Sequence, residues 1–109
     1  MKYKVKLYVN SRGEEIIKKF ILKLDKKTYT KYLRLIDSLS VYGPSISFPY
    51  SRKLTKNLLE LRTTGKNLIR LIYINSNNIF VVLHAFQKKT NKTPLQEIKT
   101  AEARRLILK

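Results

Sequence analysis

The chain of 109 residues is short enough to form one domain, and its composition restricts the partners that it can bind. It carries 24 Lys and Arg against 7 Asp and Glu, a formal net charge of +17, whereas a net charge of ~2–8 keeps a small domain soluble. Hydrophobic residues make up 43% of the chain, which argues against a disordered basic tail, and the absence of cysteine excludes disulfides and thiolate metal sites. We therefore expect a single domain over residues 1–109 that works in the reducing cytoplasm.

The positive charge is spread over the whole chain. Residues 1–51 hold 11 basic and 4 acidic residues, and residues 52–109 hold 13 and 3. Such a charge attracts phosphate-rich partners through long-range forces and counterion release. No apolar run approaches the ~18 residues of a membrane-spanning helix. Nucleic acid is therefore the favoured partner, ahead of an anionic membrane surface, and we expect no membrane association.

The first half of the chain predicts one strand and two helices. Residues 2–9 alternate lysine with apolar side chains, which is the period of a half-exposed strand. After a turn at Ser11-Arg12-Gly13, residues 14–22 show the pattern of a short amphipathic helix. Asp25 is the expected N-cap of a longer helix that ends at Gly43-Pro44. The apolar stripe expected on this second helix comprises Tyr29, Tyr32, Leu33, Ile36 and Leu39.

The second half predicts three strands and a helix. Residues 45–56 contain Pro and Ser with a basic cluster of Arg52, Lys53 and Lys56, and we interpret them as a loop. The runs 58–64, 68–75 and 79–87 are rich in β-formers and separated by turn residues, which favours an antiparallel meander. Thr93-Pro94-Leu95-Gln96 has the spacing of a capping box and predicts a helix to residue 108.

These elements predict an α+β domain of order β-α-α-β-β-β-α. Its antiparallel sheet would be covered by two N-terminal helices and a C-terminal helix, and the first strand would join the later three to bury its apolar side. The last two strands are apolar on both sides, so we expect cover on both faces of the sheet.

The residue types exclude several kinds of active site. His84 is the one histidine, and the acidic residues show no metal-binding pair of the DxD type. The sequence also contains no Gly-rich phosphate-binding loop. We therefore expect no metal and no cofactor. His84 lies between the apolar residues Val82 and Phe86 of a predicted strand, which favours a structural role over catalysis.

The candidate functional residues are cations on the predicted sheet and just after it, with aromatic residues among them. Arg70 interrupts an apolar strand, where a charged guanidinium is costly unless it lines a groove or pairs with an anion. The alternative to a functional role is an ion pair with Glu60 or Glu97. The cations are Arg62, Arg70, Lys88, Lys89 and Lys92, and the aromatic residues are Tyr73 and Phe86.

Cations of this kind suit RNA cleavage without metal. The 2′-hydroxyl of RNA attacks the adjacent phosphate, and arginine neutralises the charge that grows in the transition state. A lysine among other cations has a lowered pKa, so its neutral form becomes available to accept a proton. Aromatic side chains stack on exposed bases. From composition alone, simple binding of RNA or DNA remains the better-supported reading.

The second half of the chain resembles the RelE/ParE toxin superfamily, in particular its HigB-like, phage-derived branch. The first half fits that family more loosely. The motifs that carry the resemblance are Leu61-Arg62, Arg70 with Tyr73, Leu83-His84-Ala85-Phe86-Gln87-Lys88-Lys89-Thr90, Lys92-Thr93-Pro94, and Glu97-Ile98 with Ala101.

This resemblance implies a RelE-like fold and a type II toxin. Such toxins enter the ribosomal A site and cleave mRNA there as endoribonucleases, which stops translation. A cognate helix-turn-helix antitoxin of HigA type inhibits the toxin, and the complex represses its own operon by binding operator DNA.

The resemblance also implies an active centre. Its catalytic residues would be Arg62, Arg70, Lys88 and Lys89, with the two arginines on the scissile phosphate and a lysine as proton carrier or charge stabiliser. By the same pattern, Lys92 and Tyr73 would position the message. From the residues themselves, we also expect RNA contacts from the aromatic Phe86 and from the basic cluster of Arg52, Lys53 and Lys56.

Two other functions remain open at this point. A ParE-like protein would share the fold and poison DNA gyrase without cleaving RNA. A non-enzymatic basic protein would bind nucleic acid and do no chemistry.

Overall fold

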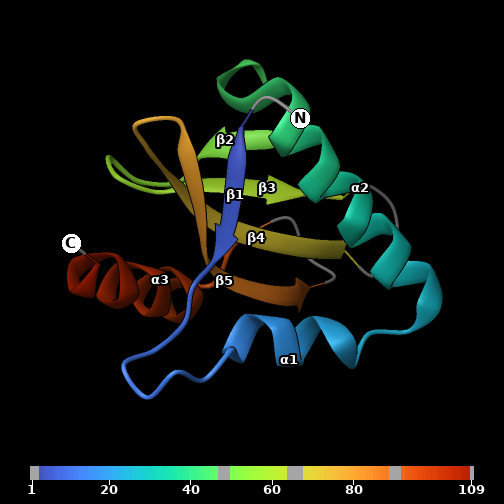
Figure 1. Ribbon diagram of the computed structural model, residues 1–109, viewed down its shortest axis with the longest axis horizontal. Coiled ribbons are helices and arrows are strands. Elements are labelled where there is room, and N and C mark those ends of the chain that lie inside the picture. Colours follow the sequence, from blue (N-terminus) through green and yellow to red (C-terminus); the bar gives the residue numbers. More distant parts are fainter. Residues whose placement is uncertain (1–2, 47–49, 64–67, 89–91, 109) are drawn as a thin grey trace.

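The computed structural model describes residues 3–46, 50–63, 68–88 and 92–108, apart from the side chain of residue 88. Over these residues the fold is α+β with three α-helices, as predicted, and its sheet has five strands where four were predicted (Figure 1). The elements are β1 (Lys4–Leu7), α1 (Ile16–Leu22), α2 (Lys26–Tyr42), the 3-10 helix η1 (Gly43–Ser45), β2 (Ser51–Lys53), β3 (Leu59–Arg62), β4 (Leu68–Ser76), β5 (Ile79–Lys88) and α3 (Leu95–Ile107).

The sheet has the order β1-β5-β4-β3-β2 and is mixed. β2 to β5 pair antiparallel in sequence, which confirms the predicted meander. β1 joins the sheet as predicted but lies parallel to β5, so the expectation of an antiparallel sheet is wrong for this strand. Alternation shows which side a strand buries, and it carries no information on the direction in which the strand pairs.

The segment expected to be a loop over residues 45–56 contains β2. This strand pairs with β3, with Arg52 opposite Glu60. It has three residues, Ser-Arg-Lys, at the edge of the sheet. Its sequence is too short and too polar to show the alternation by which a strand is recognised, so the prediction of a loop throughout was wrong.

α1 and α2 pack on one face of the sheet and form the main core with it (Figure 1). Asp25 is the N-cap residue of α2, as predicted, although its side chain donates and accepts no capping hydrogen bond. The buried stripe of α2 runs through Tyr32, Leu35 and Leu39, whereas Leu33, which was expected in it, is 47% exposed. The predicted spacing of three and four residues is that of a helix, but the buried side of α2 is centred on Leu35 and not on Leu33.

α2 ends at Tyr42 with Gly43 as its C-cap, which confirms the predicted helix stop. Gly43 has φ +52° and ψ −123°, a backbone conformation that L side chains rarely adopt. A Cβ at this position would lie 2.5 Å from the Tyr3 ring, just before β1. Glycine is therefore required both for the turn and for the close approach of α2 to the N-terminal strand.

α3 packs on β5 and β4 from the other side, which confirms that both faces of these strands are covered. Its N-cap residue is Pro94 and the helix begins at Leu95, so the predicted capping box with Thr93 as N-cap is wrong. The hydroxyl of Thr93 is used elsewhere. Within the described residues, no helix is both long and apolar enough to span a bilayer.

Candidate nucleic-acid interface

Three arginines lie on the α3 side of the sheet. Arg62 of β3 is paired with Arg70 of β4, and Arg70 is paired in turn with Phe86 of β5. Arg52 of β2 is paired with Glu60 of β3, in the neighbouring row. Paired residues share a face of a sheet, and so do residues two apart on one strand. Three neighbouring strands therefore place these arginines on one surface.

Glu60 provides the negative charge in this cluster. Its carboxylate is fully buried, with 0% of the side chain exposed. Oε1 accepts a hydrogen bond of 2.9 Å from Nε of Arg52, and Oε2 lies 3.8 Å from a terminal guanidinium nitrogen of Arg70. The ion pair of Arg70 with Glu60 was one of the alternatives that the sequence left open, and the structure contains it.

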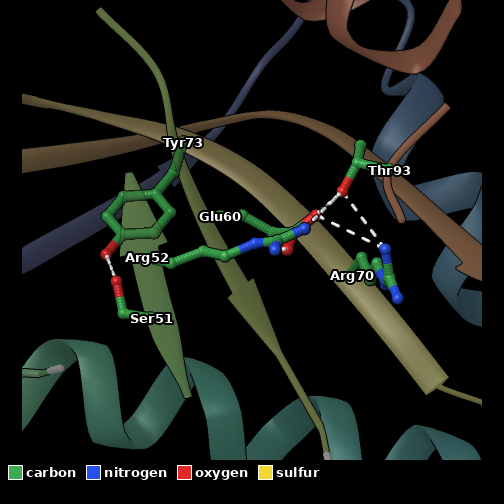
Figure 2. Close-up of polar contacts among 6 residues, drawn as sticks. All are labelled: Ser51, Arg52, Glu60, Arg70, Tyr73 and Thr93. Atoms are coloured by element: carbon green, nitrogen blue, oxygen red, sulfur yellow. Dashed lines mark hydrogen bonds and ion pairs between the residues drawn. The ribbon is translucent and has the colours of Figure 1, made fainter. Parts of the chain in front are cut away.

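Thr93 joins the carboxylate to both arginines, as Figure 2 shows. Its hydroxyl donates a hydrogen bond to Oε2 of Glu60. The hydroxyl oxygen of Thr93 in turn accepts hydrogen bonds from Arg70, at 3.1 Å, and from Arg52, at 3.2 Å. The segment before α3 is thereby fixed to β2, β3 and β4 at one point.

Arg70 is the most deeply placed of the three arginines, with 0% of its side chain exposed. Burial lowers the pKa of its guanidinium, the carboxylate of Glu60 opposes that shift, and the positive charges of Arg52 and Arg62 add to it. The guanidinium still stays protonated at ordinary pH, because arginine is not deprotonated in proteins. Two guanidinium groups thus contact one carboxylate, and the third, that of Arg62, lies on the same face opposite Arg70. The cluster therefore has an excess of positive charge that suits an anionic ligand.

Tyr73, predicted to contact RNA, lies on the opposite face of the sheet. It is 3% exposed, and its hydroxyl is 2.8 Å from the hydroxyl of Ser51. Burial raises the pKa of Tyr73, and the hydrogen bond with Ser51 partly offsets this. The odd spacing from Arg70 already indicates the opposite face of a strand. The structure therefore does not bring Tyr73 together with the arginines.

Phe86 lies on the same face as the arginines but is 7% exposed. Its ring stacks on His84, with ring centroids 5.5 Å apart and planes 24° apart. One side of the Phe86 ring is thus already occupied, which leaves little room for a base.

His84 fastens α3 to β5. Its Nε2 lies 2.5 Å from a carboxylate oxygen of Glu97, and its Nδ1 lies 3.3 Å from a guanidinium nitrogen of Arg104. Because a guanidinium only donates, this network assigns the proton of the neutral ring to Nε2, which then donates to Glu97. Arg104 also donates to the carbonyl of Leu83 at 2.8 Å. Both ring nitrogens serve structural contacts, in line with the role that the sequence favoured.

The structure describes four of the five predicted lysines, one of them by its backbone alone. Lys92 is exposed and directly precedes Thr93. Lys53 and Lys56 are exposed, but Lys53 follows Arg52 and so alternates to the other side of β2. Lys88 is the last residue of β5 and its backbone pairs with Leu68. Lys89 lies outside the described residues.

Two members of the polar cluster were not assigned a site role from the sequence. Glu60 was considered only as an ion-pair partner of Arg70, although its position two residues before Arg62 places both on one face of β3. Thr93 was interpreted as a helix cap.

Within the described part of the chain, no three His, Asp or Glu residues gather in a way that would hold a metal ion.

One family model matches the chain. It is the model for the phage-derived protein Gp49-like, and it matches residues 19–106. The chain belongs to this family. The Gp49-like family is of the RelE/HigB toxin type, associated with toxin–antitoxin systems, so the toxin-type relationship inferred from the motifs is confirmed at this level. No curated protein sequence matches the chain.

Proposed function

We propose that this Gp49-like protein is the toxin of a type II toxin–antitoxin system that cleaves mRNA at the ribosome without metal. The observation that carries the proposal is the arginine surface, which we define as Arg52, Arg62 and Arg70 with Glu60 among them. A toxin-type family and a net charge of +17 support a polyanionic substrate on this surface.

The proposed reaction uses the nucleophile that RNA itself contains. The 2′-oxygen attacks the neighbouring phosphorus while the bond from phosphorus to the 5′-oxygen breaks. A base takes the proton of the 2′-hydroxyl, and an acid gives a proton to the departing 5′-oxygen. The products are a 2′,3′-cyclic phosphate and a 5′-hydroxyl, so atoms and charge balance without oxidant, reductant or metal.

The burial of the arginines divides their roles. Arg62 is half-buried and Arg52 keeps 36% of its side chain exposed, so both reach solvent. We assign the direct contact with the scissile phosphate to Arg62, with Arg52 beside it. Arg70 is fully buried beneath them and acts through its neighbours, by adding positive potential and by holding Glu60.

The lysines complete the proposed site. Lys92 is exposed next to Thr93 and would bind the message on either side of the cut. A lysine of the pair Lys88 and Lys89 is the proposed proton carrier, because the pair begins two residues after Phe86 in the sequence and Phe86 is paired with Arg70. Lys53 and Lys56, at the edge of the sheet, would bind ribosomal or messenger RNA more loosely.

A cognate antitoxin is the expected protein partner. The family is associated with toxin–antitoxin systems, and a strongly basic toxin needs a partner that covers its positive surface. We propose a helix-turn-helix antitoxin, whose complex with this protein binds operator DNA.

The proposal is tested with purified protein, translating ribosomes and an mRNA whose new 5′ ends are mapped. The parent protein should create new 5′ ends in the message that the ribosomes translate. Arg62→Ala should slow cleavage by ~10²–10³-fold, the loss typical for one charge-stabilising group in a transition state. Arg34→Ala is the matched control, because it removes the same charge from an exposed position on α2 and should leave the rate unchanged.

Two results would contradict the proposal. Equal cleavage by the parent and Arg62→Ala would show that the arginine surface is not the site. A parent that creates no new mRNA ends but inhibits DNA gyrase would favour the ParE-like activity instead.

A further inference from the structure

The hydroxyl of Thr93 uses its entire hydrogen-bonding capacity inside the arginine surface. A hydroxyl has one hydrogen to donate and two lone pairs to accept with. The hydrogen goes to Glu60, and the lone pairs accept from Arg52 at 3.2 Å and Arg70 at 3.1 Å. Thr93 is 6% exposed, so water does not substitute easily for any of these partners.

Helix capping does not account for this arrangement. A threonine before a Pro–x–x–Glu segment ordinarily caps the helix with its side chain. Here the N-cap residue is Pro94, no side chain caps the helix, and the backbone N–H of Glu97 donates to the carbonyl of Pro94 at 3.1 Å. The hydroxyl of Thr93 is therefore turned away from its own helix and towards three side chains on β2, β3 and β4 (Figure 2).

The position of Thr93 links two parts of the proposed site. It follows Lys92, and it contacts arginines from two strands that are not neighbours in the sheet, β2 and β4. The rest of α3 is held by separate contacts, in which His84 binds Glu97 and Arg104. Removing the hydroxyl should therefore change the alignment of the cations while α3 stays docked.

We propose that Thr93 is a positioning residue of the active site, which sets the alignment of Arg52 and Arg70, and the placement of Lys92 beside them, through one shared hydroxyl. This inference rests on the proposed ribonuclease function. It assigns Thr93 no contact with RNA. Its effect reaches the phosphate through the two guanidinium groups and through Glu60.

The test compares Thr93→Val with Thr93→Ser. Valine has nearly the shape of threonine but offers no hydrogen bond, whereas serine keeps the hydroxyl and loses the methyl group. Thr93→Val should lower kcat for mRNA cleavage by ~10–100-fold and change KM by less than ~3-fold, because misalignment by a fraction of an ångström weakens the transition state more than the bound ground state. Thr93→Ser should keep kcat within ~3-fold of the parent.

Glu97→Gln separates positioning from simple docking of the helix. It weakens the contact of α3 with His84 at a point away from the arginine surface. The positioning role predicts that kcat of Glu97→Gln, per folded molecule, stays within ~2-fold of the parent, because the substitution leaves the contacts of Thr93 unchanged and so adds almost nothing to the barrier. An equal loss of kcat in Glu97→Gln and Thr93→Val would overturn the inference, because Thr93 would then act only by docking α3.

The failure of the inference and the failure of the proposed function give different results. A parent that cleaves mRNA together with an equally active Thr93→Val would overturn the inference alone. A loss of kcat in Thr93→Ser as large as in Thr93→Val would also overturn it. A parent that does not cleave at all would overturn the proposed function, and the inference with it.

Discussion

The two faces of the sheet are built from the same strands and differ in what holds them together. On the face covered by α1 and α2, Leu61 and Leu71 are fully buried among apolar side chains. On the face towards α3, their sequence neighbours Glu60 and Arg70 are equally buried but charged, and they meet through Thr93. One residue along a strand thus separates an apolar core from an ionic cluster, since side chains alternate between faces.

The difference indicates that the two faces serve different purposes. Burial of apolar area stabilises the fold by about 25 cal/mol per Å², whereas a buried ion pair loses most of its Coulomb gain to desolvation. The core residues therefore provide the stability of the fold. The charged cluster contributes little net stability, and its value lies in holding guanidinium groups beside exposed cations.

The largest effect is expected from Glu60→Ala. It leaves the buried guanidinium of Arg70 without its carboxylate, which should lower the free energy of unfolding by ~3–5 kcal/mol. Urea denaturation followed by circular dichroism measures this change.

A double substitution sharpens that result. Glu60→Leu with Arg70→Met replaces the pair by apolar side chains and should bring the free energy of unfolding to within ~1 kcal/mol of the parent. The same double variant should not cleave mRNA, because two members of the charged cluster are gone. If Glu60→Ala costs less than ~1 kcal/mol, the charges are solvated and the contrast between the faces disappears.

On the apolar face, Leu71→Ala should lower the free energy of unfolding by ~2–4 kcal/mol, because it opens a cavity where the side chain is 0% exposed. Cleavage per folded molecule should stay at the parent rate, since Leu71 points away from the arginine surface. Stability and the single-turnover rate are measured on the same preparation. A large fall in the rate at full folding would mean that the faces are coupled.

The smallest effect is a fall in the free energy of unfolding at alkaline pH, caused by Tyr32 on the apolar face. Burial, with a smaller contribution from Tyr29, raises the pKa of Tyr32 to about 12 from its usual 10.0. Between these values the unfolded chain loses the proton that the folded protein keeps. Stability is therefore intact below about pH 10 and falls as the pH rises to about 12, by up to ~2–3 kcal/mol.

Tyr32→Phe tests that dependence. It removes the titrating hydroxyl and should flatten the fall in urea midpoint between about pH 10 and pH 12. Some slope should remain, because burial also raises the pKa of Tyr73. An unchanged slope in Tyr32→Phe would show that Tyr32 is solvated.

Most of the fold was predictable because it is encoded in short-range patterns. β4 and β5 are long apolar runs around an Asn turn, and Asn77 and Asn78 adopt the positive φ expected there. The parallel pairing of β1 was not predictable, because it depends on how the chain crosses the sheet between β1 and β5. β2 was not predicted because its three polar residues are too few to show the alternation of polar and apolar side chains that marks a strand.

The cations of the candidate site could be predicted from the sequence, whereas the hydrogen bonds that join them to Glu60 and Thr93 could not. Arg70 stands out as a charge in an apolar strand, Arg62 alternates with apolar residues on the strand before it, and the structure places the two arginines directly opposite one another. Thr93 follows a local capping rule in the sequence, and a partner 33 residues away, Glu60, takes its hydroxyl instead. A long-range contact of this kind leaves no local trace.

The most direct test of the proposed chemistry changes one atom of the substrate. Once the cut site is mapped, an mRNA carrying a single 2′-deoxynucleotide on the 5′ side of that bond is offered to the parent protein on ribosomes. Cleavage at that bond should stop while binding persists, and the unmodified message should yield a 2′,3′-cyclic phosphate and a 5′-hydroxyl. Cleavage of the deoxy-substituted bond at the normal rate would contradict a mechanism in which the arginine surface acts on an attack by the 2′-hydroxyl.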